Sequence, residues 1–353
     1  MKKLLALVLA ALLCVSVLAA CSGNGGQQGG GEQQGSGEQQ ETTPEETTPE
    51  ETTPAAEQDT SMTINVAALN GPTGMGMANL NKWSDEGNTA YKYTVTYSSA
   101  PDDLTGGLIN GGLDIAAVPV NLASVLYNKT GGEVLVCAVN TLGVLYMVTK
   151  DETISSMADL EGKTIASAGQ GSTPEYVLNY LLEKNGLTDK VTVEYKAEHA
   201  ECLTSLTEGT ADVIMIPEPF VTNAMAKVEG ARVCINITQE WNAVADANIV
   251  QGVLVVRKAF AQEHPEVVKA FLDEYKRSVD QTNADPAATA AIIEEYGIVA
   301  AAAVAEKAIP NCNIVCYTGG EMEHMVSSML QVLFNANPQS VGGNMPAEDF
   351  YLK

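Results

Sequence analysis

Residues 114–119 read DIAAVP, and residues 212–217, which lie 98 positions later, read DVIMIP. The same offset aligns further residues: Gly71 with Gly169, Leu80 with Leu178, Tyr97 with Tyr195, Leu108 with Leu206, Gly111 with Gly209 and Gly132 with Gly230. No gap is needed, and so many matches at one offset indicate an internal duplication.

Each copy alternates short apolar runs with helical stretches, which is typical of buried and mainly parallel strands with helices between them. We therefore predict an α/β fold with two similar lobes. The expected strands are residues 62–69, 91–97, 113–118 and 134–141 in the first copy and 163–168, 191–195, 211–216 and 231–237 in the second. The expected helices begin near 74, 102 and 119 and near 174, 198 and 217.

Two apolar runs outside the repeat, residues 143–150 and 252–257, are expected to cross between the lobes as hinges. A helical tail follows, with helices at 260–280, 287–296, 299–307 and 320–334, and is expected to return to the first lobe. The predicted domains are residues 62–145 plus 253–353 for lobe 1 and 146–252 for lobe 2.

The first 20 residues have the pattern of a signal peptide, with Lys2 and Lys3 before a short apolar run. The run ends in Leu-Ala-Ala-Cys21, which resembles the bacterial lipobox and implies lipidation of Cys21; the alternative is an ordinary secretory signal with a chance cysteine. Residues 21–61 are rich in Gly, Gln, Glu, Thr and Pro, so we expect a disordered acidic tether. The expected location is the outer face of the cell membrane, with a lipid anchor.

The charge of the body excludes polyanionic partners. Without the two lysines of the leader and the nine acids of the tether, the formal charge is −18, which argues against binding to nucleic acid. Five cysteines remain in the body, and an odd number excludes full pairing within the chain. Cys312 and Cys316 are the candidates for a disulfide; the alternative is that both thiols are free.

Four motifs carry a resemblance to a known family: residues 69–74 (LNGPTG), 114–119, 212–219 (DVIMIPEP) and 159–165 (DLEGKTI). With the duplication, the crossings and the tail, the chain resembles a type II solute-binding protein of ABC transporters, in the group for nitrate, sulfonates, taurine and thiamine precursors. The likeness covers nearly all of 62–353. It implies a type II periplasmic-binding-protein fold, hinge closure around a solute, ABC permease subunits as partners, a monomer, and neither a cofactor nor catalysis.

Ligands of open parallel sheets bind beyond the carboxyl ends of the strands. In this chain those ends are six loops, residues 70–74, 98–101, 119–121, 169–173, 196–199 and 217–219. The ligand-binding residues predicted from these loops and from the crossings are Asn70, Gly71, Pro72, Thr73, Gly74, Ser98, Ser99, Pro119, Asn121, Tyr146, Gly171, Ser172, Thr173, His199, Glu218, Trp241 and Gln251.

Several of these residues have a plain structural alternative. A glycine-rich loop before a helix is also a tight turn with a capping hydroxyl, although two such loops at equivalent positions favour a ligand site. Glu218 either accepts a hydrogen bond from the solute or only stabilises a helix start. His199 is either a donor to the solute or a capping residue. Tyr146 and Trp241 are the preferred aromatic side chains for stacking, yet most aromatics lie in a core.

The solute class follows mainly from the arginines. None of Arg232, Arg257 and Arg277 lies in the six loops, so no clamp for a carboxylate or phosphate is visible. With the negative body, this favours a neutral or weakly cationic nitrogen heterocycle or amine, with a small anion such as a sulfonate or nitrate as the alternative. No metal-ligand spacing and no nucleophile elbow occur in the sequence, so we expect no metal site; an enzyme on the same fold and a surface sensor are the remaining alternatives.

Overall fold

The computed structural model describes residues 58–99, 101–246 and 248–353, and all structural statements below concern these residues. They fall in one compact unit, residues 54–353. The predicted signal peptide, the predicted lipidation site Cys21 and most of the predicted tether lie outside the described residues. The exception is the end of the tether, because the first strand begins at Asp59, where the backbone N–H donates to the carbonyl of Ala90 at 2.8 Å.

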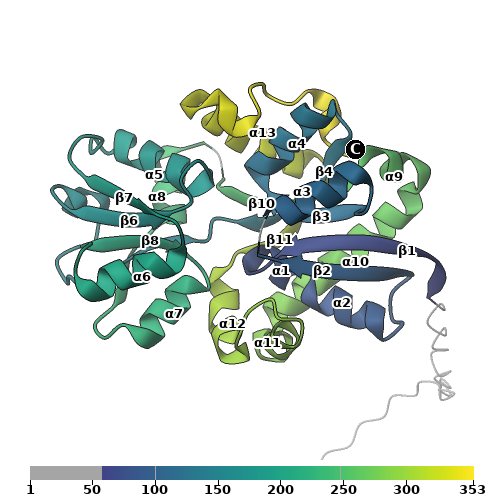
Figure 1. The fold of residues 1–353 in the computed structure, drawn as a ribbon, viewed down its shortest axis with the longest axis horizontal. Coiled ribbons are helices and arrows are strands. Elements are labelled where there is room, and N and C mark those ends of the chain that lie inside the picture. The colour runs from purple at the N-terminus through teal and green to yellow at the C-terminus, as the bar shows by residue number, and fades with distance from the viewer. Residues whose placement is uncertain (1–57, 100, 247) are drawn as a thin grey trace, which may run out of the picture. The chain divides into compact units, whose positions relative to one another are not determined.

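Six strands form the first sheet, in the order β11-β4-β10-β3-β1-β2 (Figure 1). They are β1 (Asp59–Leu69), β2 (Tyr91–Ser98), β3 (Ile115–Pro119), β4 (Val134–Leu142), β10 (Val250–Arg257) and β11 (Ile314–Tyr317). The helices of its first half are α1 (Pro72–Met75), α2 (Ala78–Asp85), α3 (Pro101–Asn110) and α4 (Val120–Thr130). We call this sheet with its helices the first lobe.

Five strands form the second sheet, in the order β7-β6-β8-β5-β9. They are β5 (Leu145–Thr149), β6 (Thr164–Ala168), β7 (Thr192–Lys196), β8 (Val213–Pro217) and β9 (Arg232–Asn236). The accompanying helices are η1 (Met157–Leu160), α5 (Thr173–Lys184), α6 (His199–Glu208), α7 (Phe220–Lys227) and α8 (Ile237–Val244), of which η1 and α8 were not predicted. This sheet with its helices is the second lobe.

The duplication is confirmed element by element. The strand β8 starts and ends 98 residues after β3, and α6 repeats the position of the helical stretch in α3 with the same offset. The sheets also agree in topology, since β2-β1-β3-β10-β4 corresponds to β7-β6-β8-β5-β9. The predicted two-lobed α/β fold is therefore present.

The two crossing runs are strands, and this corrects the expectation of mainly parallel sheets. The strand β10 pairs antiparallel with both β3 and β4, and β5 pairs antiparallel with both β8 and β9. Each crossing strand thus lies at the equivalent position of its own sheet, between two strands that run antiparallel to it. Both sheets are therefore mixed. The predicted domain boundaries, after 145 and after 252, fall within β5 and β10 and stay predictions.

The tail differs from the prediction in two details. The expected helix 260–280 is two helices, α9 (Lys258–Glu263) and α10 (Pro265–Ala284), because Pro265 cannot continue the helix before it. Between α12 (Ala302–Ala308) with η2 (Ile309–Asn311) and α13 (Gly319–Ala336), the short β11 joins the edge of the first sheet. The remaining tail elements are α11 (Pro286–Glu295), η3 (Pro338–Val341) and η4 (Glu348–Phe350).

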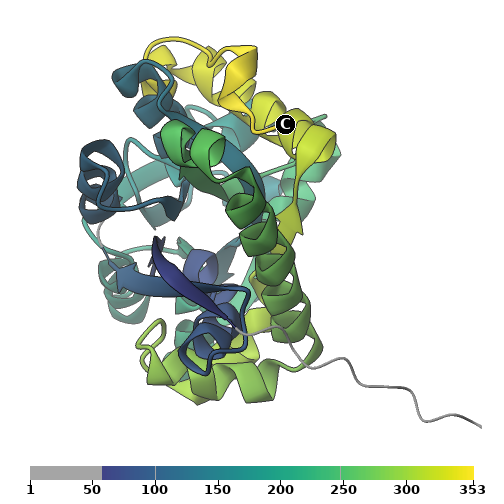
Figure 2. The ribbon, with the colours of Figure 1, turned by 90° about the vertical axis from the view of Figure 1, so that its right-hand side faces the viewer.

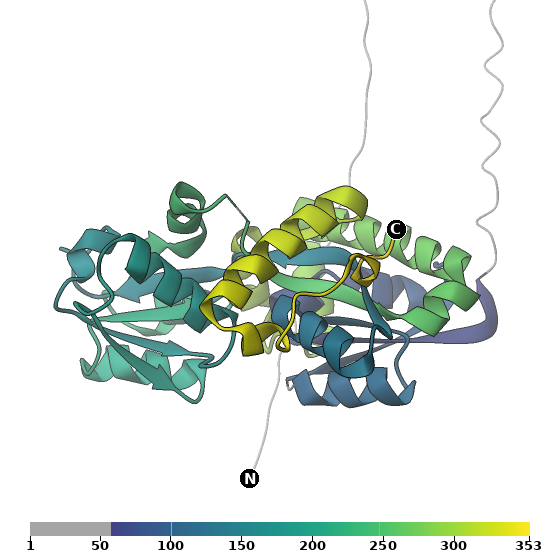
Figure 3. The ribbon, with the colours of Figure 1, turned by 90° about the horizontal axis from the view of Figure 1, so that it is seen from above.

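The tail packs on the first lobe and also reaches the second. Helix α10 lies against α2 and β11 (Figure 2), and α13 lies against α4 and β4 (Figure 3). In addition α12 contacts α7, and α13 contacts α5, where the side-chain N–H of Asn337 donates to Oη of Tyr176 at 3.2 Å. The tail therefore contacts both lobes. Within the described residues no helix is long and apolar enough to span a membrane.

Candidate functional site

Loops of the two lobes meet where β1 and β8 end. Gly71 has φ of +87°, and a Cβ atom at this position would lie 4.0 Å from Cδ of Pro219 in the other lobe. Asn70 links its loop to the next one, because its backbone N–H donates to the carbonyl of Ser98 at 2.8 Å and its amide donates to Oγ of Ser99 at 3.0 Å. Three of the six predicted loops thus lie close together.

The strongest sign of a ligand site is a set of buried polar atoms without a partner. Oγ1 of Thr173, Nδ1 of His199 and Oε1 of Gln251 are buried and form no hydrogen bond within the described residues. Such atoms are rare in native proteins because each costs free energy, and a bound water or ligand is the usual explanation. These three belong to the predicted binding residues, two from the second lobe and one from the strand that leads back to the first. Side-chain oxygens of Tyr97, Asn140, Thr141, Tyr195 and Tyr275, which were not predicted, are also buried without a partner.

His199 is a neutral ring in this environment. Burial lowers its pKa, and its ring centroid lies 5.0 Å from that of Phe220. At neutral pH the imidazole is therefore uncharged and offers one donor and one acceptor nitrogen. It suits a neutral polar group of a solute better than an anion.

The glycine-rich loop of the second lobe is partly occupied by its own side chains. The backbone N–H of Gly171 donates to Oε2 of Glu175 at 2.5 Å, and the hydroxyl of Ser172 donates to the carbonyl of Gly169 at 2.6 Å. Ser172 thus acts as a turn residue. A carboxylate next to this loop counts against an anion there.

Thr73 is engaged by other residues of the first lobe. Its hydroxyl donates to the carbonyl of Leu69 at 3.2 Å, and its own carbonyl accepts from the amide of Asn140 at 3.2 Å. Gly252 in β10 lies directly opposite, because a Cβ atom there would lie 2.5 Å from Oδ1 of Asn140 and 2.6 Å from Cγ2 of Thr73. The neighbouring Thr141 has a buried hydroxyl without a partner; sequence reasoning missed it, since it lies inside an apolar strand.

The other loop residues are placed as follows: Pro72 starts α1, Gly74 packs against the carbonyl of Leu69, Ser98 donates to Asp103 at 2.5 Å, Pro119 is the N-cap of α4, and Asn121 lies in its first turn.

Tyr146 and Glu218 turn towards a different space, between α7 and the α12–η2 segment. The hydroxyl of Tyr146 donates to the carbonyl of Asn311 at 3.1 Å, and Oε2 of Glu218 accepts from the backbone N–H of Thr222 at 3.0 Å. Both side chains line a cavity of about 480 Å³ there. The predicted site residues therefore divide between the strand ends and this cavity.

The structure corrects the prediction that Trp241 stacks on a solute, because this side chain has no exposed surface. It is 0% exposed on α8, and its ring centroid lies 4.7 Å from that of Tyr180 on α5. The apolar face of α8 packs against α5 and β5, and Trp241 is the large side chain that fills this contact.

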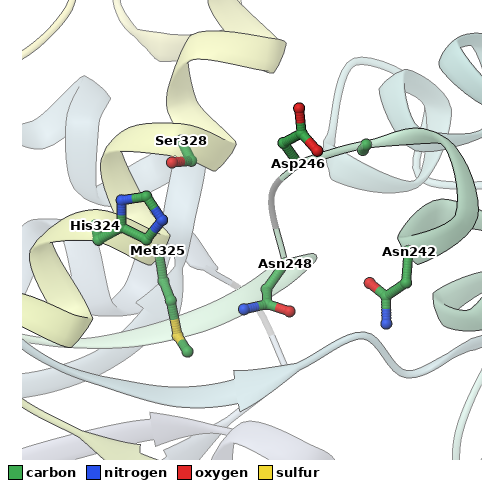
Figure 4. Close-up of a pocket in the computed structure, with 7 residues that line it drawn as sticks. Asn242, Asp246, Asn248, His324, Met325 and Ser328 are labelled. Atoms are coloured by element: carbon green, nitrogen blue, oxygen red, sulfur yellow. The ribbon is translucent and has the colours of Figure 1, made fainter.

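Two further cavities contain other residues. One of about 240 Å³ lies between α13 and the end of α8 (Figure 4). It is lined by Asn242, Ala245, Asp246, Asn248, His324, Met325 and Ser328, none of which was predicted. The other, of about 640 Å³, lies between α3 and the end of β2 and includes Ser98.

The described residues also bear on metal and thiol chemistry. No group of three or more His, Cys, Asp and Glu side chains among them could hold a metal ion. All five cysteines of the body are free, so Cys312 and Cys316 are not bonded. Burial raises the pKa of every one of these thiols, to about 11 for Cys202, Cys234 and Cys316, so each is protonated at neutral pH and is a poor nucleophile.

Changing Glu218 to glutamine should stabilise the protein increasingly as the pH rises. Burial raises the pKa of Glu218, against the opposing hydrogen bonds from Thr222 and Asn311, so the folded protein keeps this proton longer than the unfolded chain. The parent therefore loses stability as the pH rises through the raised pKa, whereas glutamine has no charge to bury and still accepts from Thr222. Urea unfolding from about pH 4 to about pH 8 measures the difference. A difference that stays constant over this range would contradict the buried carboxyl.

Two similar α/β lobes, joined by crossing strands and facing each other through loops at their strand ends, define a type II periplasmic-binding-protein fold. Residues 108–289 match the family described as NMT1/THI5 like, and the chain belongs to this family. No curated protein sequence matches the chain.

Solved structures show the same fold at low sequence identity. An ABC transporter protein from Parabacteroides distasonis is 24% identical with a TM-score of 0.71, over 82% of this chain and 99% of that one. The periplasmic aliphatic sulphonate binding protein of Escherichia coli is 16% identical with a TM-score of 0.67, over 82% and 92%. The desulfurization enzyme DSZB is 12% identical with a TM-score of 0.55, over 78% and 92%. Since the fold serves binding proteins and an enzyme, the site must decide the function.

Proposed function

We propose that this chain is the extracytoplasmic solute-binding component of an ABC importer and captures a small organic solute between its two lobes. The observation that carries the proposal is the set of unpartnered buried polar atoms on Thr173, His199 and Gln251, at strand ends and a crossing of a two-lobed fold. The names of the Parabacteroides and Escherichia proteins support it. Lipidation at Cys21, ABC permease subunits as partners and a monomeric state belong to the same proposal.

The solute is a neutral or weakly cationic nitrogen heterocycle or amine. The three arginines support this class, because all are engaged elsewhere. Arg232 donates to two carbonyls at the start of the second lobe, Arg257 pairs with Asp114, and Arg277 lies 4.0 Å above the ring of Trp83. A small sulfonate is the alternative, which the name of the Escherichia protein favours.

The mechanism is closure around the crossing strands. A solute that hydrogen-bonds to Thr173 and His199 on one side and to Gln251 on the other contacts both lobes. The solute therefore shifts the equilibrium towards the closed form, in which these residues lie together. The size of the shift is set by the difference between its affinities for the closed and the open form. The contacts of the tail with α7 and α5 have to form or slide during this motion.

Catalysis is the competing function, since the fold is shared with an enzyme. The protonated thiols offer no activated cysteine among the described residues, and neutral His199 has no acidic partner that would orient it as a base. These features support capture over turnover.

Thermal unfolding of the purified protein with pyrimidines, amines, sulfonates and nitrate tests the proposal. A solute at about 100 times its Kd adds about 2.7 kcal/mol, which raises Tm by several degrees. A rise with pyrimidines or amines supports the proposed class, and a rise with sulfonates alone selects the alternative. Unchanged Tm across the panel, with no solute retained through purification, would contradict solute capture.

Changing Thr173 to valine should stabilise the free protein and weaken solute binding. The hydroxyl is buried without a partner, so its replacement by a methyl group removes a cost of about 1–3 kcal/mol. The same change removes a hydrogen bond to the solute, which should raise Kd about tenfold. The exposed Thr204 of α6, changed to valine, is the matched control and should alter neither quantity. If Thr173→Val destabilises the free protein, the hydroxyl has a partner and the site is misplaced.

A further inference from the structure

The cavity between α7 and the α12–η2 segment has the features of a second ligand site. Its volume of about 480 Å³ lies within the range of small-molecule pockets. The lining residues come from both lobes: Tyr146, Glu218, Val221, Thr222, Met225, Ala226 and Val233 from the second, and Lys307 and Asn311 from the tail. Helices α7 and α12 contact each other beside it (Figure 1).

A buried acid lies in its wall. Glu218 is 2% exposed, and its carboxyl accepts hydrogen bonds from the backbone of Thr222 and from the side chain of Asn311. These donors are neutral, so the buried carboxylate lacks a counter-charge. An ammonium group of a ligand would supply that charge, and a buried charge is tolerated when it is paired and hydrogen-bonded.

A lysine offers the opposite charge to the same cavity. Lys307 near the end of α12 is exposed and forms no ion pair with another residue of the described ranges. Its flexible ammonium group is free to meet a carboxylate. The cavity therefore offers a negative and a positive group to one occupant.

The remaining wall is apolar. Val221, Met225 and Val233 line it, and the last two are among the few large apolar residues that stay exposed, at 37% and 41%. An aliphatic group in the cavity would cover them and remove that apolar surface from water.

We propose that this cavity binds a small zwitterion with an aliphatic side chain, as in a branched-chain α-amino acid. The ammonium pairs with Glu218, the carboxylate with Lys307, and the side chain lies on Met225 and Val233. This goes beyond the proposed function, because Tyr146 and Glu218 are the only residues of the cavity that belong to the predicted binding residues of the cleft. An occupant contacts α7 and the tail together, so it stabilises the present arrangement of these elements and influences closure.

Calorimetric titration of the purified protein with L-leucine tests the proposal. We expect one site, about tenfold weaker binding after Lys307→Gln, and loss of binding after Ala226→Trp, which fills the cavity. The matched controls are Lys129→Gln on α4 and Ala284→Trp at the end of α10, both exposed and outside the cavity. Isopentylamine and 4-methylpentanoate, which are leucine without its carboxylate and without its ammonium group, should bind at least about tenfold more weakly than leucine.

Four results would overturn the proposal: no binding of leucine, valine or isoleucine; equal effects of the cavity variants and their controls; equal binding of leucine and isopentylamine; or leucine binding that Thr173→Val abolishes while the cavity variants retain it. The last result would make leucine the solute of the cleft, so failure of the second site stays distinct from failure of the proposed function.

Discussion

Replacing Trp241 by alanine will lower the free energy of unfolding by about 3–5 kcal/mol, a large part of the stability of a typical protein. The side chain is completely buried against Tyr180 and belongs to the largest core cluster. Removal of an indole leaves a void that the surrounding helices α5 and α8 cannot fill without losing their own contacts.

Urea unfolding followed by circular dichroism measures this loss. The matched control is Val244→Ala on the same helix, because Val244 is 37% exposed and its truncation should change the free energy by only about 0.5 kcal/mol. If Trp241→Ala leaves stability unchanged and instead abolishes solute binding, the indole stacks on the solute and its place in the core is wrong.

Replacing Asp114 by alanine will cost about 3 kcal/mol or more of unfolding free energy. Its carboxylate accepts from the guanidinium of Arg257 at 2.6 Å and from the backbone N–H of Asn65 at 2.9 Å, and the residue is 7% exposed. The guanidinium also donates to the carbonyl of Leu113 at 2.8 Å. The substitution leaves a largely buried cation without its counter-charge, which costs far more than the loss of one hydrogen bond.

The duplication supplies the matched control. Asp212, 98 residues later, accepts from the backbone N–H of Thr164 at 2.8 Å in the same way, but it is exposed and pairs with no arginine of the second lobe. We expect Asp212→Ala to cost about 1 kcal/mol. The difference between the two variants in chemical unfolding measures the ion pair with Arg257. Equal losses would mean that the pair contributes nothing beyond the shared backbone contact.

Asp114 also holds one end of β10. Arg257 ends β10, the strand that carries the chain back to the first lobe, and Asp114 fixes that end to the start of β3. The other end of β10 carries Gln251 and Gly252, next to the loop of Thr73. Both ends of the strand are paired with β3 or β4, and the ion pair adds a further contact at the Arg257 end.

The sequence determined the architecture because the duplication repeats its pattern at one offset. Apolar runs bounded by helical stretches fixed β3 and β8 within a residue or two, since buried strands depend on local residue type. The rule that ligands bind at strand ends also selected Thr173 and His199, and the second crossing selected Gln251; that these residues bind a solute stays a prediction.

Only the tertiary structure decided how the crossings pair and which way side chains face. The apolar runs of β5 and β10 read alike in either direction, so their antiparallel pairing depends on the strands beside them. For Trp241 the sequence left open whether it stacks on the solute or lies in a core. For Glu218 it left open whether the carboxylate accepts a hydrogen bond from the solute or only stabilises a helix start. The indole of Trp241 packs in the core between α5 and α8, and the packing of α12 against α7 buries the carboxyl group of Glu218. Both environments are built from segments that are distant in sequence, so only the tertiary structure decided them.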